Sequence, residues 1–306
     1  MAALAAALVG CAAPQTRQIL HNRDAADLPA AAMNSDVPFI AQDDLYCGPA
    51  SLAMALGATG DAVGQQTVAK AIYTPGREGT LRSDVLAGAR RWGRLAVPVG
   101  SLSGVLREVA AGNPVIVFQN LSLPIAPQWH FAVAVGYDLD RREIILHSGT
   151  ARAKRTGLST FEHTWARGDH WALVVTAPDR IPATASETEA LGAAAALERV
   201  DRLDAARTAW TAVVGRWPDS FGGHMGLGNT LYARGNYSGA RAAFSKAAEI
   251  RPDAAEAWNN LAYALSALGE LKAAVAAAEK AVRLGGGAPN YRDTLEEMRA
   301  AAKAAA

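Results

Sequence analysis

The sequence predicts an α+β domain followed by an all-α domain built from helical repeats. Between residues 36 and 177, segments with the apolar spacing of helices come first and mostly strand-like segments follow. From residue 187 onward, the same residue types return at a fixed 34-residue offset, which is typical of stacked helical repeats. The length of 306 residues also favours about two domains.

Composition and charge exclude several classes of function. The chain carries 30 Lys and Arg against 29 Asp and Glu, so a net charge of +1 gives no support to a nucleic-acid partner. No Gly-rich phosphate loop with Gly-Lys-Ser/Thr is present. Without a second thiol near Cys47 or a close His and carboxylate spacing, we expect no metal site and no cofactor.

The first residues are predicted to be a lipoprotein signal segment. An Ala- and Leu-rich stretch ends in Leu8-Val9-Gly10-Cys11, which resembles a bacterial lipobox whose cysteine becomes the acylated N-terminus. With Ala12 next, this resemblance implies an outer-membrane lipoprotein facing the periplasm, held to the membrane by a lipid at Cys11. The alternative is a frayed Ala-rich terminus. We expect residues 1–11 to be the signal segment and residues 12–35, which lack periodicity, to be a tether.

Cys47 is the first candidate for chemistry. It lies in Gln42-Asp43-Asp44-Leu45-Tyr46-Cys47-Gly48-Pro49-Ala50, where the apolar spacing of a helix begins. Unpaired N–H groups and the positive end of the helix dipole favour a thiolate at such a position, and the thiolate is the nucleophilic form. If Cys11 is acylated, Cys47 is the remaining thiol in an oxidising compartment. The alternative is a buried cysteine that acts as a small apolar residue.

His130 is the candidate base for this thiol. The segment Gln128-Trp129-His130-Phe131-Ala132-Val133-Ala134-Val135-Gly136-Tyr137 has the composition of a strand, with the histidine near its start. Cys and His partners of thiol enzymes meet in space rather than along the chain. The alternative is a core histidine at a strand edge. Four other histidines lack this context: His147, His163, His170 and His224.

Together these two segments resemble the bacteriocin-processing, double-glycine cysteine peptidases within the papain-like group. The resemblance covers roughly residues 35 to 177 and implies a papain-like α+β fold. It also implies that Cys47 attacks a peptide carbonyl while His130 takes the thiol proton. Gln42 would then bind the oxyanion together with the backbone N–H of Cys47; its other interpretation is a solvated turn residue.

The sequence departs from these relatives at the residue that orients the imidazole. The relatives place Asp or Asn after the second strand of the histidine hairpin, where this chain has Leu146-His147-Ser148-Gly149-Thr150. Ser148 is our candidate for this role, and the alternatives are Gln119, Asn120, a backbone carbonyl or a water. Because loss of the orienting group lowers activity, a degenerate domain that only binds peptides remains a second hypothesis.

Residues 178–186 have the composition of a linker, and the repeats follow in residues 187–303. Five pairs of equivalent residues lie 34 positions apart: Leu227 and Leu261, Leu231 and Leu265, Gly235 and Gly269, Ala240 and Ala274, and Ala247 and Ala281. This period resembles that of tetratricopeptide repeats, which implies an all-α solenoid. We expect three repeats at 187–220, 221–254 and 255–288, closed by a capping helix.

The first helices of the repeats carry candidate binding residues. Asn229, Tyr232, Asn259 and Tyr263 are predicted to lie on the concave face, where amide and aromatic groups hold an extended peptide. The alternative is ordinary packing between repeats.

The leading hypothesis is a cell-envelope thiol peptidase whose repeats recruit a protein partner or present a substrate. The alternatives are a non-catalytic repeat scaffold with a peptide-binding first domain, and an acyltransferase that uses Cys47 and His130 with an amine as acceptor.

Overall fold

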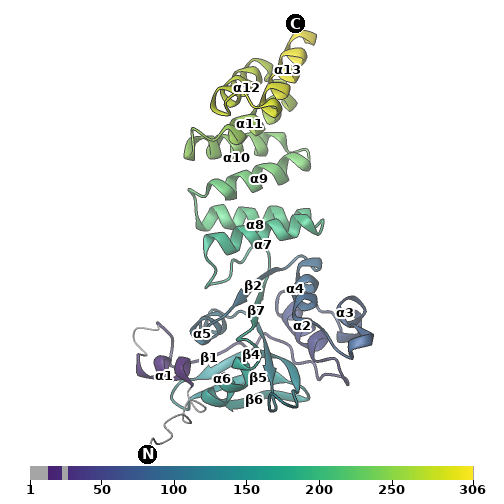
Figure 1. Ribbon diagram of the computed structural model, residues 1–306, viewed down its shortest axis with the longest axis vertical. Coiled ribbons are helices and arrows are strands. Elements are labelled where there is room, and N and C mark those ends of the chain that lie inside the picture. Colours follow the sequence, from purple (N-terminus) through teal and green to yellow (C-terminus); the bar gives the residue numbers. More distant parts are fainter. Residues whose placement is uncertain (1–12, 23–26, 306) are drawn as a thin grey trace, which may run out of the picture. The chain divides into compact units, whose positions relative to one another are not determined.

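The computed structural model describes residues 13–22 and 27–305, which form two compact units (Figure 1). The first unit runs to Ala177 and also takes up Pro182–Ala185, while the second comprises Pro178–Ile181 and the chain from Ser186 onward. The first is an α+β unit with an antiparallel sheet and the second is a run of helices, so the predicted fold class is confirmed.

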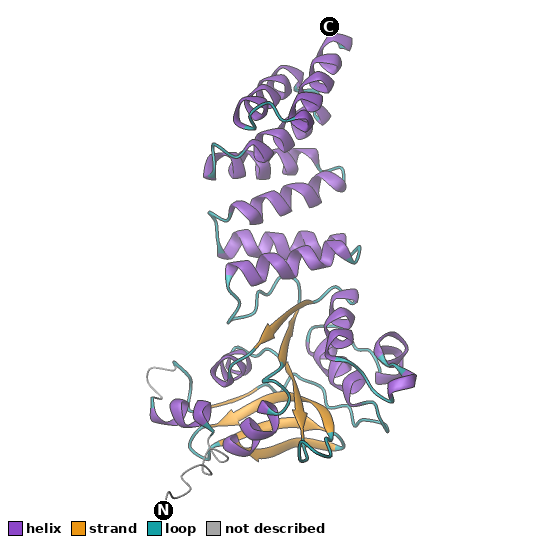
Figure 2. Ribbon diagram, in the orientation of Figure 1, coloured by secondary structure: helices purple, strands orange, loops and turns teal. Residues whose placement is uncertain are grey.

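The first unit is organised around one antiparallel sheet (Figure 2). The strand order is β2-β7-β3-β4-β5-β6, and β1 pairs with the C-terminal part of β4. The strands are β1 (Ala31–Met33), β2 (Leu95–Val99), β3 (Val115–Asn120), β4 (Trp129–Asp138), β5 (Glu143–Ser148), β6 (Ala151–Gly157) and β7 (Ala172–Thr176). Central strands β3 and β4 are apolar and buried on both faces, which requires helices on each side.

Helices cover the sheet on its two faces. On one face, apolar residues of α2 (Cys47–Ala58), α3 (Gln65–Ile72) and α4 (Arg82–Arg91) pack on alternate sheet residues in a single core cluster. On the other face, α5 (Leu102–Ala110) and α6 (Leu158–Ala166) contact strands β3 to β6 (Figure 1). The α2 face holds the first candidate residue, Cys47.

The predicted tether does not match the structure, because described parts of residues 12–35 belong to the first unit. Helix α1 (Pro14–His21) buries Ile19 and contacts α5 and α6, and β1 extends the sheet. The Glu162 carboxylate accepts hydrogen bonds from the first backbone N–H groups of α1, at Gln15 (3.0 Å) and Thr16 (2.7 Å). An eight-residue helix held by a residue far along the chain leaves little periodicity to detect. Cys11 lies outside the described residues.

Two local features depend on residues that are distant in the sequence. Glu162 of α6 caps the start of α1 rather than that of its own helix, which begins at Leu158. The basic stretch containing Lys154 is edge strand β6, paired with β5. Charged side chains on an edge strand oppose pairing with another chain, which is why this strand lacks an apolar pattern.

A buried carboxylate fixes the chain where the first unit ends. Glu108 of α5 is fully buried and accepts a hydrogen bond from the Asn113 side chain at 2.6 Å. It also accepts from the backbone N–H groups of Ala183 (3.2 Å) and Thr184 (2.6 Å) and from the Thr184 hydroxyl. Part of the predicted linker, residues 182–185, therefore belongs to the first unit.

The second unit consists of helix pairs. Its helices are α7 (Glu187–Arg199), α8 (Leu203–Arg216), α9 (Phe221–Ala233), α10 (Tyr237–Ile250), α11 (Ala255–Ala267), α12 (Leu271–Leu284) and α13 (Pro289–Ala304). Glycines let neighbouring helices approach closely: a Cβ at Gly226 would lie 2.5 Å from Trp210, and one at Gly228 would lie 2.4 Å from Phe244. Such contacts between adjacent helices are what stabilises a solenoid.

Candidate active site

Cys47 is the first residue of α2, directly after the tight turn formed by residues 43–46. Tyr46 precedes the helix without a side-chain cap, so the first N–H groups of α2 are available near the thiol. Next to it, Gly48 allows Thr80 to approach, because a Cβ at this glycine would lie 2.7 Å from Thr80 Cβ. The glycine that follows Cys47 is therefore needed for the close contact with Thr80 beside the candidate nucleophile.

Burial and helix position act on the Cys47 thiol in opposite directions. Burial raises the pKa of Cys47, whereas the backbone N–H groups of Phe131, Gly48 and Cys47 itself lower it, and the effect of burial is the larger. The helix start thus favours a thiolate, as expected, but the net pKa lies above the ordinary value. In the resting site Cys47 is a thiol.

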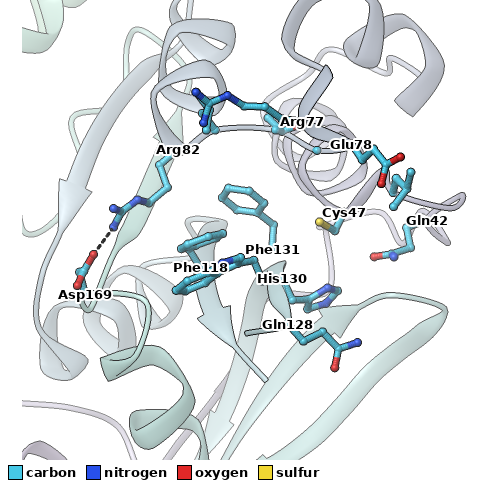
Figure 3. Close-up of a pocket in the computed structure, with 15 residues that line it drawn as sticks. Gln42, Cys47, Arg77, Glu78, Arg82, Phe118, Gln128, His130, Phe131 and Asp169 are labelled. Carbon is cyan, nitrogen blue, oxygen red and sulfur yellow. Dashed lines mark hydrogen bonds and ion pairs between the residues drawn. The ribbon is translucent and has the colours of Figure 1, made fainter. Parts of the chain in front are cut away.

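His130 lies at the start of β4 and contacts Ser148 at the end of β5. Its Nε2 is 2.9 Å from Ser148 Oγ, which leaves Nδ1 as the nitrogen that can exchange a proton with another group. Figure 3 shows the imidazole and the Cys47 sulfur directed toward the same space. Of the orienting groups left open by the sequence, Gln119 donates instead to Thr164 (2.5 Å) and Asn120 accepts from loop backbone.

Among the described residues, the hydrogen-bond partner of the His130 ring is a hydroxyl and not a carboxylate. Burial, followed by the positive charge of Lys154 on β6, lowers the pKa of His130 to about 4. A neutral hydroxyl at Ser148 does not stabilise the imidazolium as a carboxylate would. The resting pair is therefore a neutral thiol and a neutral imidazole.

Gln42 lies beside Cys47 (Figure 3). Its backbone is hydrogen-bonded to the turn that follows Ser148. Its backbone N–H donates to the carbonyl of Gly149 at 3.2 Å, and Gly149 has a φ of +62°, which a residue with a side chain rarely adopts. One β5–β6 turn thus holds Gln42 and the residue that contacts His130.

Gln65, which positions Gln42, was not predicted from the sequence. Its buried side chain accepts from the backbone N–H of Asp43 at 3.0 Å and donates to the carbonyl of Ala41 at 2.9 Å. These two bonds fix the backbone on both sides of Gln42. A glutamine in the first turn of a helix gives no sequence signal for a contact 22 or 24 residues away.

Leu45 closes the turn between Gln42 and Cys47 in an uncommon backbone conformation. Its φ is +64°, and its side chain is half exposed. A non-glycine residue in this region costs about 1–3 kcal/mol and persists where the surroundings impose it. Here the hydrogen bond from Tyr46 N–H to the Asp43 carbonyl closes the turn at 3.0 Å.

A cleft of about 920 Å³ brings three of the predicted site residues together. The cleft is within the size range of ligand sites. It is lined by Gln42, Leu45, Cys47, Arg77, Glu78, Gly79, Thr80, Leu81, Arg82, Phe118, Gln128, Trp129, His130, Phe131 and Asp169. Ser148 lies behind His130 rather than in the lining.

The other histidine of this region, His147, has a structural role. The Ala153 N–H donates to its Nδ1 at 3.2 Å, so its protonated Nε2 faces the carbonyl of Val37 at 3.3 Å. Burial is the main cause that lowers the pKa of His147. Within the described ranges, no group of three or more His, Cys, Asp and Glu residues could hold a metal ion.

The predicted binding residues of the second unit mostly contact neighbouring helices. Asn229 of α9 accepts from the Asn260 side chain at 3.0 Å, and Tyr263 of α11 donates to Glu297 at 3.1 Å. Tyr232 packs against Tyr237, with ring centroids 5.1 Å apart. Of these four residues, Asn259 alone has a buried side-chain oxygen that finds no hydrogen-bond partner within the described part of the chain. The alternative of packing between repeats thus accounts for much of this set.

Comparison with known families follows the same division of the chain. Residues 34–171 match the model of the Peptidase_C39 like family, and residues 228–269 and 255–284 match models of the tetratricopeptide repeat. The chain carries a C39-like peptidase domain followed by tetratricopeptide repeats. No curated protein matches the chain.

Solved structures similar to the C39-like domain have low sequence identity. A protein described as a C39-like peptidase from Bacillus anthracis is 19% identical, with 48% of this chain and 98% of that chain covered, at a TM-score of 0.41. The peptidase domain of Streptococcus ComA, a bi-functional ABC transporter, is 17% identical. The match covers 46% of this chain and 98% of that chain, with a TM-score of 0.38. For the repeats, the Sgt2 TPR domain from Aspergillus fumigatus is 19% identical. The match covers 39% of this chain and 80% of that chain, with a TM-score of 0.37.

Proposed function

We propose that this protein is a thiol peptidase that uses Cys47 as nucleophile and His130 as base. The observation that supports this most directly is a single cleft lined by Cys47, His130 and Gln42, with the imidazole held by Ser148. The match to a C39-like family over the residues that carry these side chains supports the same proposal.

The neutral resting pair determines how the first step proceeds. The Cys47 sulfur forms a bond to the peptide carbonyl carbon while its proton passes to His130, so no thiolate accumulates beforehand. The carbonyl oxygen becomes an oxyanion that accepts hydrogen bonds from the Gln42 side chain and the Cys47 backbone N–H.

Three further proton transfers complete the cycle. Collapse of the tetrahedral intermediate breaks the carbon–nitrogen bond, and His130 returns its proton to the leaving amine. A water then attacks the thioester, gives its proton to His130, and releases the carboxylic acid as Cys47 regains its thiol.

A peptide-cleavage assay with matched variants tests the proposal. The full chain is incubated with a proteome-derived peptide mixture, and new termini are identified by mass spectrometry. We expect products from the unsubstituted protein, none from Cys47→Ala, and rates lower by about 10²–10⁴ in His130→Ala. Added glycinamide separates the alternatives, because an acyltransferase incorporates the amine into its products whereas a peptidase gives free acids.

The neutral pair also supports a second candidate, a peptide-binding domain without turnover. A buried thiol beside an imidazole whose pKa is lowered to about 4 lacks a preformed ion pair. If no peptide is cleaved by the unsubstituted protein, but Cys47→Ala retains peptide binding, this second function replaces the first.

We further propose that the repeats bind a protein partner or substrate and that a lipid at Cys11 holds the protein to the membrane. The repeat family and its use in peptide recognition support the first part. The segment Leu8-Val9-Gly10-Cys11 supports the second. No helix of the described residues could cross a bilayer. Mass spectrometry of the N-terminal peptide tests acylation, which Cys11→Ser abolishes.

A further inference from the structure

An aromatic wall lines the cleft on the side of Cys47 away from Gln42 (Figure 3). Strand register pairs Phe118 of β3 with Phe131 of β4, and the two-residue period of a strand puts Trp129 on the same face. The rings of Phe118 and Trp129 are stacked, with centroids 5.2 Å apart and planes at 9°, and those of Phe118 and Phe131 are 4.6 Å apart.

The Trp129 end of this wall is open to solvent. Trp129 is 50% exposed although it is stacked on Phe118, whereas Phe131 beneath them is 2% exposed. Because its ring is already held by the neighbouring ring, Trp129 can bury apolar surface of a ligand without first being ordered. Aromatic side chains gain most from such burial.

The arginine that lies over this wall is paired with a carboxylate. The Arg82 guanidinium lies 5.5 Å from the Phe118 centroid and forms an ion pair with Asp169 at 3.1 Å (Figure 3). With its charge met by a carboxylate, this arginine does not favour an acidic group on the wall. The composition of the wall is therefore suited to an uncharged apolar side chain.

We propose that the cleft selects peptides with a bulky apolar side chain, aromatic or branched aliphatic, close to the bond that Cys47 attacks. This side chain lies against Trp129 and Phe118. A pair of glycines, which the double-glycine peptidases take, would leave the exposed Trp129 ring in water. The inference rests on the proposed function, because it places the selected side chain next to the reacting carbonyl.

Dipeptidyl chloromethyl ketones test the selection at the thiol itself. Three N-acetylated probes are used, with the sequences Gly-Gly, Phe-Gly and Gly-Phe, so that the aromatic group occupies either position. Cys47 sulfur bonds to the probe methylene and chloride leaves, while the thiol proton passes to His130. The rate of adduct formation at Cys47 is measured by mass spectrometry and divided by the iodoacetamide rate of the same variant.

We expect at least one Phe-containing probe to label Cys47 about tenfold faster than Gly-Gly, from burial of the ring. Trp129→Ala should reduce this preference to about onefold to threefold, and Trp129→Phe should keep most of it. Leu123→Ala is the matched control: its side chain is 64% exposed nearby but does not line the cleft, so the preference should not change.

Two results would overturn the inference: equal labelling by Gly-Gly and both Phe probes, or a preference that persists in Trp129→Ala. Failure of the proposed function is recognised separately, by labelling of Cys47 that His130→Ala does not alter. In that case saturation-transfer NMR on Cys47→Ala decides the wall's ligand class. Saturation transfer to the ring of N-acetyl-Phe-Gly-amide would support an apolar ligand for the wall, and no transfer to the ring would refute it.

Discussion

His130 and Ser148 show how one neutral contact sets the protonation state of the site. The hydroxyl keeps the imidazole in place at 2.9 Å, but it adds no negative charge against burial and Lys154, and the pKa of His130 lies near 4. The sequence predicted Cys47, His130 and Ser148 through local pattern and resemblance. It could not predict their net protonation, which depends on burial by residues from the whole first unit.

Replacing Ser148 by Asp should create the charge that the site lacks. A carboxylate next to Nε2 favours the imidazolium and, through it, the Cys47 thiolate. We expect iodoacetamide alkylation of Cys47 at pH 6 to become at least about tenfold faster than in the unsubstituted chain. Ser148→Asn is the control, since it keeps a hydrogen-bonding group without charge; an equal gain in this variant would contradict the electrostatic explanation.

Gln65 is a positioning residue for Gln42, and it has a neighbour that makes a matched control. Gln65→Ala leaves two backbone groups beside Gln42 without partners, at about 1–3 kcal/mol each. We expect kcat to fall about tenfold or more while the chloromethyl ketone still reaches Cys47. Gln66→Ala removes only an exposed bond to Asp43, so a similar loss of kcat there would argue against positioning.

At the scale of elements, buried strands could be predicted from their apolar runs. Elements that depend on contacts with distant residues could not be predicted. Strand β4 (Trp129–Asp138) lies within one residue, at each end, of the strand expected from Gln128 to Tyr137, because a buried apolar run is visible in any sequence. Strands β1 and β6 were missed, since the first has only three residues and the second is a charged edge. Helix α1 was missed because contacts with residues far along the chain, among them Glu162, hold it in place.

Glu162 should therefore control whether α1 stays on the first unit. Glu162→Ala removes both acceptors and the favourable charge at the helix start, at a cost of about 1–3 kcal/mol. We expect amide exchange in residues 14–21 to become faster while exchange in the central strands changes less. Glu162→Gln keeps one acceptor and should give a smaller effect; equal exchange in all three proteins would show that α1 docks without this carboxylate.

At the scale of the whole first unit, two buried histidines make stability depend on pH. Burial lowers the pKa of both His130, to about 4, and His147. The unfolded chain then binds more protons than the folded one between pH 6.5 and 4, so stability rises with pH in this window. Above about pH 6.5 the two neutral imidazoles make their full contribution to the free energy of unfolding, and this contribution is lost as the pH falls toward 4.

We expect the urea midpoint of the first unit, followed by amide exchange in β4 and β5, to fall as the pH is lowered from 6.5 to 4. The pKa difference at His130 corresponds to at most about 3 kcal/mol. In His130→Ala the pH dependence of the urea midpoint should be weaker, because the contribution of His130 is removed. A midpoint that is constant over this range, or that rises toward pH 4, would contradict the proposed neutral state.

The contacts of Glu108 decide where the first unit can be cut from the rest of the chain. Because its buried carboxylate takes three hydrogen bonds from residues 183 and 184, a fragment stopped at the last strand would enclose an anion with only Asn113 to solvate it. The natural unit for transplantation into another protein therefore ends at Ala185. The segment that follows the last strand has the composition of a spacer, but its residues 183 and 184 solvate the buried Glu108 carboxylate. Any exchange of repeat domains therefore has to keep this segment with the first unit.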